Sequence, residues 1–281
     1  MAMSISELST RMNDYLQQEP LNYITAEDAI RPSLAGLRLF DSAIFGVAQA
    51  DSPDFELFRR PYVVGPETLL PSDWIPEAKS VISFFMAFDD QVKRSNQQDP
   101  IEPSDEWLHA RIEGQDMVAA FGKHLESLIK DAGYQAVYAA ADPRFKRLGP
   151  FLSNWSERHV AYACGLGTFG LSRGLITRKG MAGRFGSVIT NAVFEPTPHD
   201  YNGPFDYCIM CGVCERNCPV GAIDASLGVE GGKNHETCVP HVGKNRIAET
   251  GSRKIRYGCG KCQVGVPCQD GIPNARWKND K

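Results

Sequence analysis

Residues 207–223, which read YCIMCGVCERNCPVGAI, determine how the rest of the chain is interpreted. The stretch has the spacing C-x2-C-x2-C-x3-C-P, and its cysteines are Cys208, Cys211, Cys214 and Cys218. In bacterial two-cluster proteins such a run places three thiolates around one [4Fe–4S] cubane, and the fourth cysteine ligates a second cluster. The stretch therefore predicts an iron–sulfur module and requires further cysteines elsewhere in the chain.

A second set of four cysteines lies downstream and supplies enough thiolates for two clusters. In two-cluster proteins the first three cysteines of one run share a cubane with the last cysteine of the other run. The spacing in the second set is irregular, since five residues separate its last two cysteines. The predicted ligands are Cys208, Cys211, Cys214 and Cys268 for the first cluster, and Cys218, Cys238, Cys259 and Cys262 for the second.

Two other interpretations account for less of the cysteine pattern. A structural zinc site could use two C-x2-C pairs, but it needs neither a third close cysteine nor a Cys-Pro ending. Disulfides are not expected from this spacing in a chain without a secretory signal. The ninth cysteine, Cys164, lies in an apolar stretch and is predicted to be a small buried side chain. His235 and His241 flank Cys238 and could donate hydrogen bonds to cluster sulfur.

Size and composition place the chain among globular proteins with a real core. It has 281 residues, of which 42% are hydrophobic, and a net charge of −4 that gives no footprint of nucleic-acid binding. No apolar run reaches the length of a membrane helix, and no signal-peptide core is present near the start. We expect a cytoplasmic protein with no membrane partner.

Hydrophobic periodicity predicts an α+β fold. Residues 4–18 and 107–132 carry apolar side chains at helical spacing, and Ser104 or Asp105 can cap the second helix, which Gly133 would end. Residues 154–164 are also predicted to be helical, whereas 51–76 and 89–105 read as irregular segments. The predicted strands are 42–48, 80–88, 136–140, 175–177 and 185–194, the last two joined around Lys179-Gly180.

The composition changes near residue 197, where proline, aspartate, asparagine and glycine mark a boundary. We therefore expect an α/β domain over residues 1–200 and a ferredoxin-like domain with two clusters over residues 201–281. Neither predicted cluster has an obvious open position, because eight thiolates satisfy both. Any chemistry on a substrate should therefore take place in the first domain.

Three blocks of sequence resemble one known superfamily in the same order. They are residues 74–82 (WIPEAKSVI), residues 157–170 (ERHVAYACGLGTFG) with their continuation to 190, and the cysteine region with CPVGAI at 218–223. Together they resemble the cobalamin-dependent epoxyqueuosine reductases and reductive dehalogenases, as a divergent member. The resemblance implies a nitroreductase-like domain that holds a base-off cobalamin beside a ferredoxin module.

The glycine-dense block at 165–170 is the predicted place for that corrinoid, because glycine lets backbone approach a flat macrocycle closely. The structural alternative is that these glycines serve only tight turns and packing. A flavin in the same domain is a further alternative. The predicted cofactor-binding residues are Gly165, Leu166, Gly167, Gly170, Arg173, Ser187, Val188, Ile189 and Thr190.

The chain departs from epoxyqueuosine reductases where their proton donor is expected. No acid stands in residues 149–156 (GPFLSNWS), and Asn191 follows Thr190 where the superfamily often has aspartate. We therefore do not expect tRNA as substrate. Tyr138, Asp142 and Tyr162 are alternative catalytic candidates by residue type, although each also has a plain structural interpretation.

These features favour an iron–sulfur oxidoreductase that passes electrons through two clusters to cobalamin, which reduces a small organic substrate. Ferredoxin or flavodoxin would be the electron donor. The alternative is a partner protein without a substrate of its own that transfers electrons or reduces another protein's corrinoid. A basic group of Arg173, Arg178, Lys179 and Arg184 could bind an anion, or could form a solvated surface.

Overall fold

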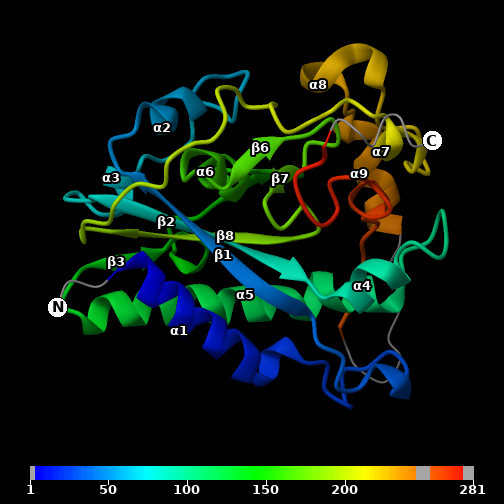
Figure 1. Ribbon diagram of the computed structural model, residues 1–281, viewed down its shortest axis with the longest axis horizontal. Coiled ribbons are helices and arrows are strands. Elements are labelled where there is room, and N and C mark those ends of the chain that lie inside the picture. The colour runs from blue at the N-terminus through cyan, green and yellow to red at the C-terminus, as the bar shows by residue number, and fades with distance from the viewer. Residues whose placement is uncertain (1–3, 245–253, 275–281) are drawn as a thin grey trace.

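The centre of the protein is a four-stranded antiparallel sheet (Figure 1). The structure is a computed structural model that describes residues 4–244 and 254–274. The strand order is β1-β2-β8-β3, with β1 spanning Phe40–Gln49, β2 Ser80–Phe88, β8 Gly183–Thr190 and β3 Ala136–Tyr138. Every residue of β2 is buried because helices or loops cover both faces of the sheet. The fold class predicted from the sequence, α+β, is confirmed.

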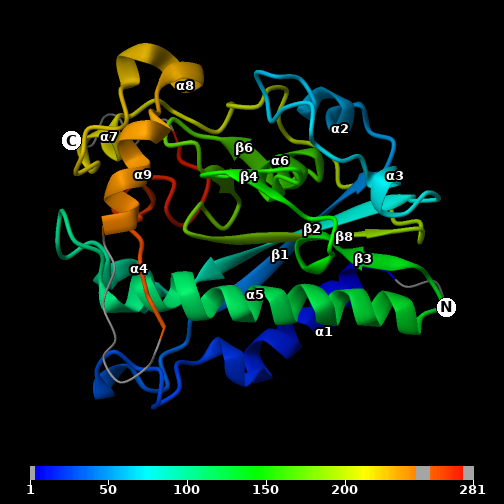
Figure 2. The same cartoon turned by 180° about the vertical axis from the view of Figure 1, so that it is seen from behind.

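Two helices cover one face of the sheet (Figures 1 and 2). They are α1 at Ile5–Gln18 and α5 at Asp105–Asp131, and both predicted helices are thus confirmed within two residues. The hydroxyl of Ser104 caps α5 by accepting a hydrogen bond from the amide of Trp107 at 3.2 Å. Gly133 follows the helix end with a left-handed φ of 90°.

The opposite face carries a smaller layer of short elements. Its helices are α2 at Pro53–Phe58, α3 at Pro71–Trp74 and α6 at Glu157–Ala163. A second core of aromatic side chains fills the space beneath them, with the ring of Trp155 stacked on Phe55 and set edge-on against Trp74. Because neighbouring residues of a strand point to opposite faces, Val188 and Ile189 of β8 contribute to one core each.

The structure corrects several predicted elements. The segments predicted to be irregular contain α2 and α3, and also α4 at Asp90–Ser95, each too short to show helical periodicity. The helix predicted from 154 begins at Glu157, after Ser156. Strand β7 at Leu175–Thr177 does not pair with β8; it pairs with β6 at Gly167–Phe169 in a separate two-stranded sheet. The remaining short elements are β4 (Arg147–Gly149), β5 (Leu152–Ser153), η1 (Pro20–Asn22), η2 (Pro32–Leu34) and η3 (Ala139–Ala141).

The cysteine-rich region forms one end of the molecule, next to the start of α5 (Figures 1 and 2). Its elements are α7 (Val213–Arg216), η4 (Ala225–Leu227), α8 (Gly228–Gly231), α9 (His235–Lys244) and η5 (Lys261–Gln263). Lys93 on α4 pairs with Asp270, and the amide of Asn96 donates to the carbonyl of Cys259 at 3.0 Å. The domain division at residue 200 stays a prediction, and residues 245–253 and 275–281 of the second domain lie outside the described ranges.

Across the described ranges, none of the helices has both the length and the apolar character needed to cross a membrane.

Candidate functional site

The structure brings the predicted ligands of the first cluster together. Cys208 and Cys211 lie on the loop that leads into α7, and Cys214 lies within α7. Cys268 approaches from the C-terminal segment, and all four line one small hollow. The loop bends sharply between them, with Gly212 at a φ of 71°. Burial raises the pKa of the Cys214 and Cys268 thiols to about 12. Without a metal such thiols stay protonated at neutral pH, and a metal bound there would take up the thiolate charge.

Backbone amides bond to two cysteines of this group, in one case to the sulfur. The backbone amide of Leu171 donates to the sulfur of Cys208 at 3.4 Å. The carbonyl of Cys268 accepts from the amide of Met181 at 3.0 Å, which ties the last cysteine to the segment before β8. Amide donors to ligand sulfur are a common means of setting a cluster's potential. These surroundings fit a [4Fe–4S] cluster held by the four cysteines.

The predicted ligands of the second cluster also share one site. Cys218 follows α7, and Cys238 lies on α9. Cys259 lies just before the turn η5, and Cys262 lies within it. All four line a larger cavity. The amide of Ala222 donates to the sulfur of Cys218 at 3.2 Å. Burial raises the pKa of Cys259 to about 11 and raises that of Cys238 as well.

In the described part of the chain, the cysteine groups do not form a site for one metal ion. In residues 4–244 and 254–274, no three His, Cys, Asp or Glu side chains are arranged to hold a single metal ion. The sulfurs around a cubane stand further apart than the ligands of one ion, since four iron atoms lie between them. The Lys233 ammonium adds a positive charge 3.9 Å from the sulfur of Cys262. The assignment of ligands to each cluster stays a prediction.

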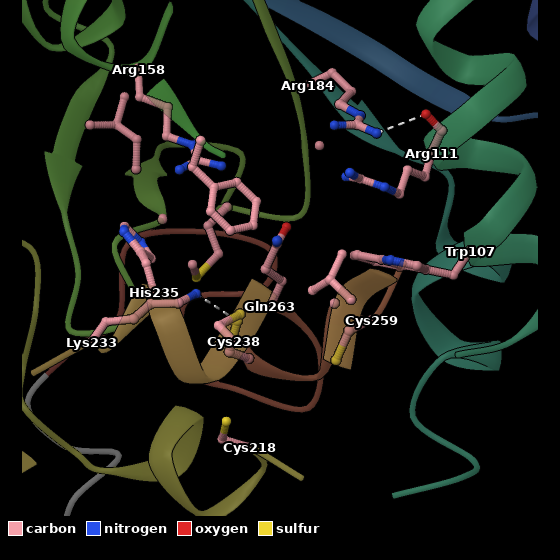
Figure 3. Close-up of a pocket in the computed structure, with 18 of the residues that line it drawn as sticks. Trp107, Arg111, Arg158, Arg184, Cys218, Lys233, His235, Cys238, Cys259 and Gln263 are labelled. Carbon is pink, nitrogen blue, oxygen red and sulfur yellow. Dashed lines mark hydrogen bonds between the residues drawn. The ribbon is translucent and has the colours of Figure 1, made fainter. Parts of the chain in front are cut away.

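The larger cavity lies between the second group of cysteines and the end of the sheet (Figure 3). Its volume is about 270 Å³. One wall carries the guanidinium groups of Arg111, Arg158 and Arg184, and the opposite wall carries the sulfurs of Cys218, Cys238 and Cys259 (Figure 3). Aromatic side chains complete the lining: Phe88, Trp107, Phe151 and Phe185. The cavity can therefore hold a small molecule with both an apolar body and polar groups.

Glu157, the first residue of α6, is the acidic side chain among the residues that line this cavity. One carboxylate oxygen accepts a hydrogen bond from the Ser187 hydroxyl at 2.7 Å, and Ser187 in turn accepts from the indole of Trp155 at 2.8 Å. The other oxygen is buried with no partner. Burial raises the pKa of Glu157 to about 8, although the Ser187 bond opposes the shift. A carboxyl that stays protonated at neutral pH can act as a proton donor.

The glycine block predicted to contact a corrinoid lies beside the cavity and does not line it. A side chain at Gly167 would meet the carbonyl oxygen of Ile176 at 1.9 Å, so close pairing of β6 with β7 requires glycine there. Gly165 has a φ of 77° and faces Thr197, while Gly170 faces the side chain of Ile176. Packing thus supplies a physical reason for these glycines, and corrinoid contact by Gly165, Leu166, Gly167 and Gly170 stays a prediction.

The other predicted cofactor-binding residues are also engaged in packing or hydrogen bonds. Ser187 holds Glu157, Val188 and Ile189 lie in the two cores, and the Thr190 hydroxyl donates to the carbonyl of Gln135 at 2.6 Å. Arg173 donates to the carbonyl of Glu230. None of these residues lines the cavity. Ser187 only forms a hydrogen bond to Glu157, which does line it. Their role in cofactor binding stays a prediction.

The three catalytic candidates lie away from the cavity. Tyr138 is buried against Gly122 of α5, and burial raises its pKa above the ordinary value. Asp142 is paired with Arg144 at 2.8 Å, and the bonds from Arg144 lower its pKa. Tyr162 packs against Phe169 and other aromatic rings. The structure therefore gives each a structural explanation.

Four charged residues of the cavity escaped the sequence prediction: Arg111, Glu157, Arg158 and Lys233. Glu157 and Arg158 are the first two residues of the second block that carries the family resemblance. Their position in that block was the signal in the sequence that could have identified them as site residues. Of the basic group predicted to bind an anion, Arg184 alone faces the cavity, whereas Arg178 pairs with Asp200. Cys164 is buried and its sulfur lies 3.4 Å from the carbonyl of Val81, as predicted for a small core side chain.

Comparison with known proteins supports the iron–sulfur segment and the fold. Residues 205–224 match the 4Fe-4S binding domain family. A search of curated protein sequences finds no match. Among solved structures, a selenomethionine-labelled epoxyqueuosine reductase superposes with a TM-score of 0.50 at 18% identity, covering 84% of this chain and 66% of that one.

Two further structures show the same likeness. An epoxyqueuosine reductase with an epoxyqueuosine-modified tRNA-Tyr stem loop gives a TM-score of 0.51 at 18% identity, covering 84% of this chain and 63% of that chain. A variant of the catabolic reductive dehalogenase NpRdhA gives 0.50 at 14% identity, covering 84% and 31% respectively. This chain thus spans less than two thirds of the length of each of these proteins.

The protein is therefore an α+β iron–sulfur protein with the fold of the epoxyqueuosine reductases and reductive dehalogenases. The resemblance read from the sequence is confirmed at the level of the fold, at identities of 14–18%.

Proposed function

We propose that the protein is an iron–sulfur oxidoreductase that delivers electrons to an acceptor in the cavity beside its second cluster. The observation that supports this most directly is the lining of that cavity, where Cys218, Cys238, Cys259 and Cys262 face the arginine wall. The first group of cysteines meets the second through α7, which carries Cys214 and ends just before Cys218. Electrons would enter at the first cluster, from ferredoxin or flavodoxin, and leave from the second.

Glu157 supplies a proton for the same reaction in this proposal. Its unpartnered oxygen is buried at the cavity, and its raised pKa keeps the carboxyl protonated at neutral pH. Reduction of an organic molecule consumes protons as well as electrons, so a neutral acid beside an electron source is a suitable arrangement. Glu157 would then take the role for which Tyr138, Asp142 and Tyr162 were considered.

The sequence resemblance implies base-off cobalamin as the acceptor. The cavity of about 270 Å³ is smaller than the roughly 300–1,000 Å³ of sites for drug-sized ligands. A whole cobalamin is larger than such ligands and does not fit this cavity as it stands, so no step is derived through cobalt. We do not propose tRNA as substrate, because no acid precedes Glu157 in residues 149–156.

The proposal is tested on protein reconstituted anaerobically with iron and sulfide. We expect about eight iron atoms per chain and reduction by about two electrons, with spectra of two [4Fe–4S] clusters. Oxidised cobalamin, flavin and no additive are then offered to the reduced protein in parallel. A base-off corrinoid absorbance change identifies cobalamin, whereas a bound yellow chromophore identifies flavin. Protein that holds fewer than two redox-active clusters would contradict the proposal.

A further inference from the structure

Three positively charged side chains gather on one wall of the cavity without an acidic partner. Within the described ranges, no carboxylate forms an ion pair with Arg111, Arg158 or Arg184. The Nη2 of Arg184 donates to the carbonyl of Arg111 at 2.8 Å, and the Nη1 of Arg158 donates to the carbonyl of Arg173 at 3.3 Å. The guanidinium of Arg111 lies 4.7 Å from the ring centre of Tyr257. Uncharged groups therefore hold these cations in place.

Part of the hydrogen-bonding capacity of this wall is unused. The Nε atoms of Arg111 and Arg184 are buried and have no hydrogen-bond partner. Buried polar groups in proteins are normally paired, and buried charges normally have a counter-charge. Two orphan donors on neighbouring guanidinium groups therefore indicate that an acceptor outside the chain completes this wall.

The three cations also oppose one another. Burial lowers the pKa of Arg184 to about 9, and the charges of Arg111 and Arg158 add to that effect. Burial lowers the pKa of Arg158 as well; the charge of Cys262 opposes this shift and the charge of Arg111 adds to it. A negative charge placed between them would relieve this repulsion. Guanidinium groups suit carboxylate and phosphate in particular, because their planar forks donate two parallel hydrogen bonds.

We propose that the cavity binds a small organic anion, whose carboxylate or phosphate is held by Arg111, Arg158 and Arg184. The aromatic side chains of Trp107 and Phe185 would contact the apolar body of this ligand. Held at the arginine wall, the ligand points its other end toward Cys238 and Cys259 (Figure 3). The inference deepens the proposed function and rests on it for the statement that the ligand is the electron acceptor or its substrate.

Benzoate, phenyl phosphate and benzamide test the inference on the cluster-loaded protein under anaerobic conditions. Benzamide has the shape of benzoate without its charge. We expect benzoate or phenyl phosphate to raise the thermal midpoint with a saturable dose dependence, more at low salt than at high salt, and benzamide to have little effect. The comparison of the two anions distinguishes carboxylate from phosphate recognition.

Arginine variants identify the residues that bind. Arg184→Gln and Arg158→Gln should each weaken the binding of the preferred anion by roughly tenfold or more. Arg184→Lys, which keeps the charge but loses the fork, should weaken it less. Arg94→Gln is the matched control, because Arg94 is 74% exposed on α4 and should leave affinity unchanged. Without ligand, the Gln variants should unfold at the same or a higher temperature than the wild type, since they remove repulsion.

Equal effects of benzoate and benzamide, no response to either anion, or unchanged affinity in both Gln variants would overturn the inference. Electron paramagnetic resonance of the reduced clusters in the same samples separates the two proposals. Normal cluster signals together with no anion response would overturn the anion site alone. Missing cluster signals together with a normal anion response would instead contradict the proposed function.

Discussion

At the scale of single residues, Cys268 is the predicted ligand of the first cluster that comes from outside the regular run at 208–218. The structure nevertheless places it with Cys208, Cys211 and Cys214. We expect Cys268→Ala to lower the iron content from about eight to about four atoms per chain, with the second cluster retained. Iron and sulfide analysis measures this, and Cys164→Ala, at a buried cysteine away from both groups, should keep about eight. An unchanged iron content in Cys268→Ala would remove Cys268 from the ligand set.

The buried carboxyl of Glu157 should make the stability of the fold depend on pH. Its pKa rises from about 4.5 to about 8 on folding because burial penalises the charged form. A raised pKa contributes stability that is fully present below pH 4.5 and is lost as the pH rises through about 8. Between these values the loss approaches about 1.4 kcal/mol per pH unit. Glu157→Gln removes this titration and should be more stable than the wild type at pH 9, by a margin that shrinks toward pH 5.

Thermal unfolding of cluster-loaded protein across this pH range checks the expectation. Glu67→Gln, at an exposed position, is the control and should follow the wild-type profile. A difference between Glu157→Gln and wild type that stays constant from pH 5 to pH 9 would show that Glu157 does not titrate as described.

At the scale of the elements, Gly167 on β6 distinguishes packing from cofactor contact. A methyl group there would overlap the carbonyl oxygen of Ile176, so Gly167→Ala should cost about 1–3 kcal/mol or more even without any cofactor. Gly149→Ala on β4 is the control, because open space surrounds that position. The thermal midpoints of both variants decide the matter. If Gly167→Ala is as stable as Gly149→Ala but binds cofactor less well, the result favours corrinoid contact over packing as the reason for glycine at this position.

The sequence predicted long or strongly patterned elements well and short ones poorly. The apolar stripe of α5 and the β-branched and aromatic run of β2 are local properties, so they can be read directly. The short helices α2, α3 and α4 have too few residues to show a period. The strands predicted on either side of Lys179-Gly180 are found as β7 and β8, but the pairing of β7 with β6 could not be read from the sequence, because it depends on the close approach of Gly167 to Ile176.

At the scale of the whole molecule, the ligand groups and the cavity differ in how far a sequence can predict them. The run at 208–218 is local, and the ligand-sharing pattern of two-cluster proteins extends it to cysteines further along the chain, so the sequence predicted both groups of cysteines that the structure brings together. The cavity instead depends on tertiary packing, because Arg111 comes from α5, Arg158 from α6 and Arg184 from β8. No spacing along the chain brings these three to one wall, and the sequence consequently selected Arg184 within a basic group whose other members point elsewhere.

A buried ion pair joins the cysteine-rich end of the molecule to helix α5. Arg256, which precedes Cys259, is 1% exposed and pairs with Glu113 of α5, the Nε lying 3.0 Å from one carboxylate oxygen. Glu113 also bonds to His109, and despite its burial these bonds hold the pKa of Glu113 below its usual value. Arg256→Met would remove the bidentate partner of a buried carboxylate and leave it His109 and the more distant Lys254, at a cost of up to about 3–5 kcal/mol.

Because Arg256 also fixes the chain just before Cys259, this variant should lose iron from the second cluster before the first. Thermal unfolding and iron release, both followed anaerobically, measure the two effects. Arg31→Met is the matched control: Arg31 pairs with Glu106 on the same helix at 2.6 Å but is 47% exposed, so its loss should cost at most about 1 kcal/mol. Equal effects of the two variants, or loss of iron from both clusters together, would show that the Arg256–Glu113 pair does not anchor the second site.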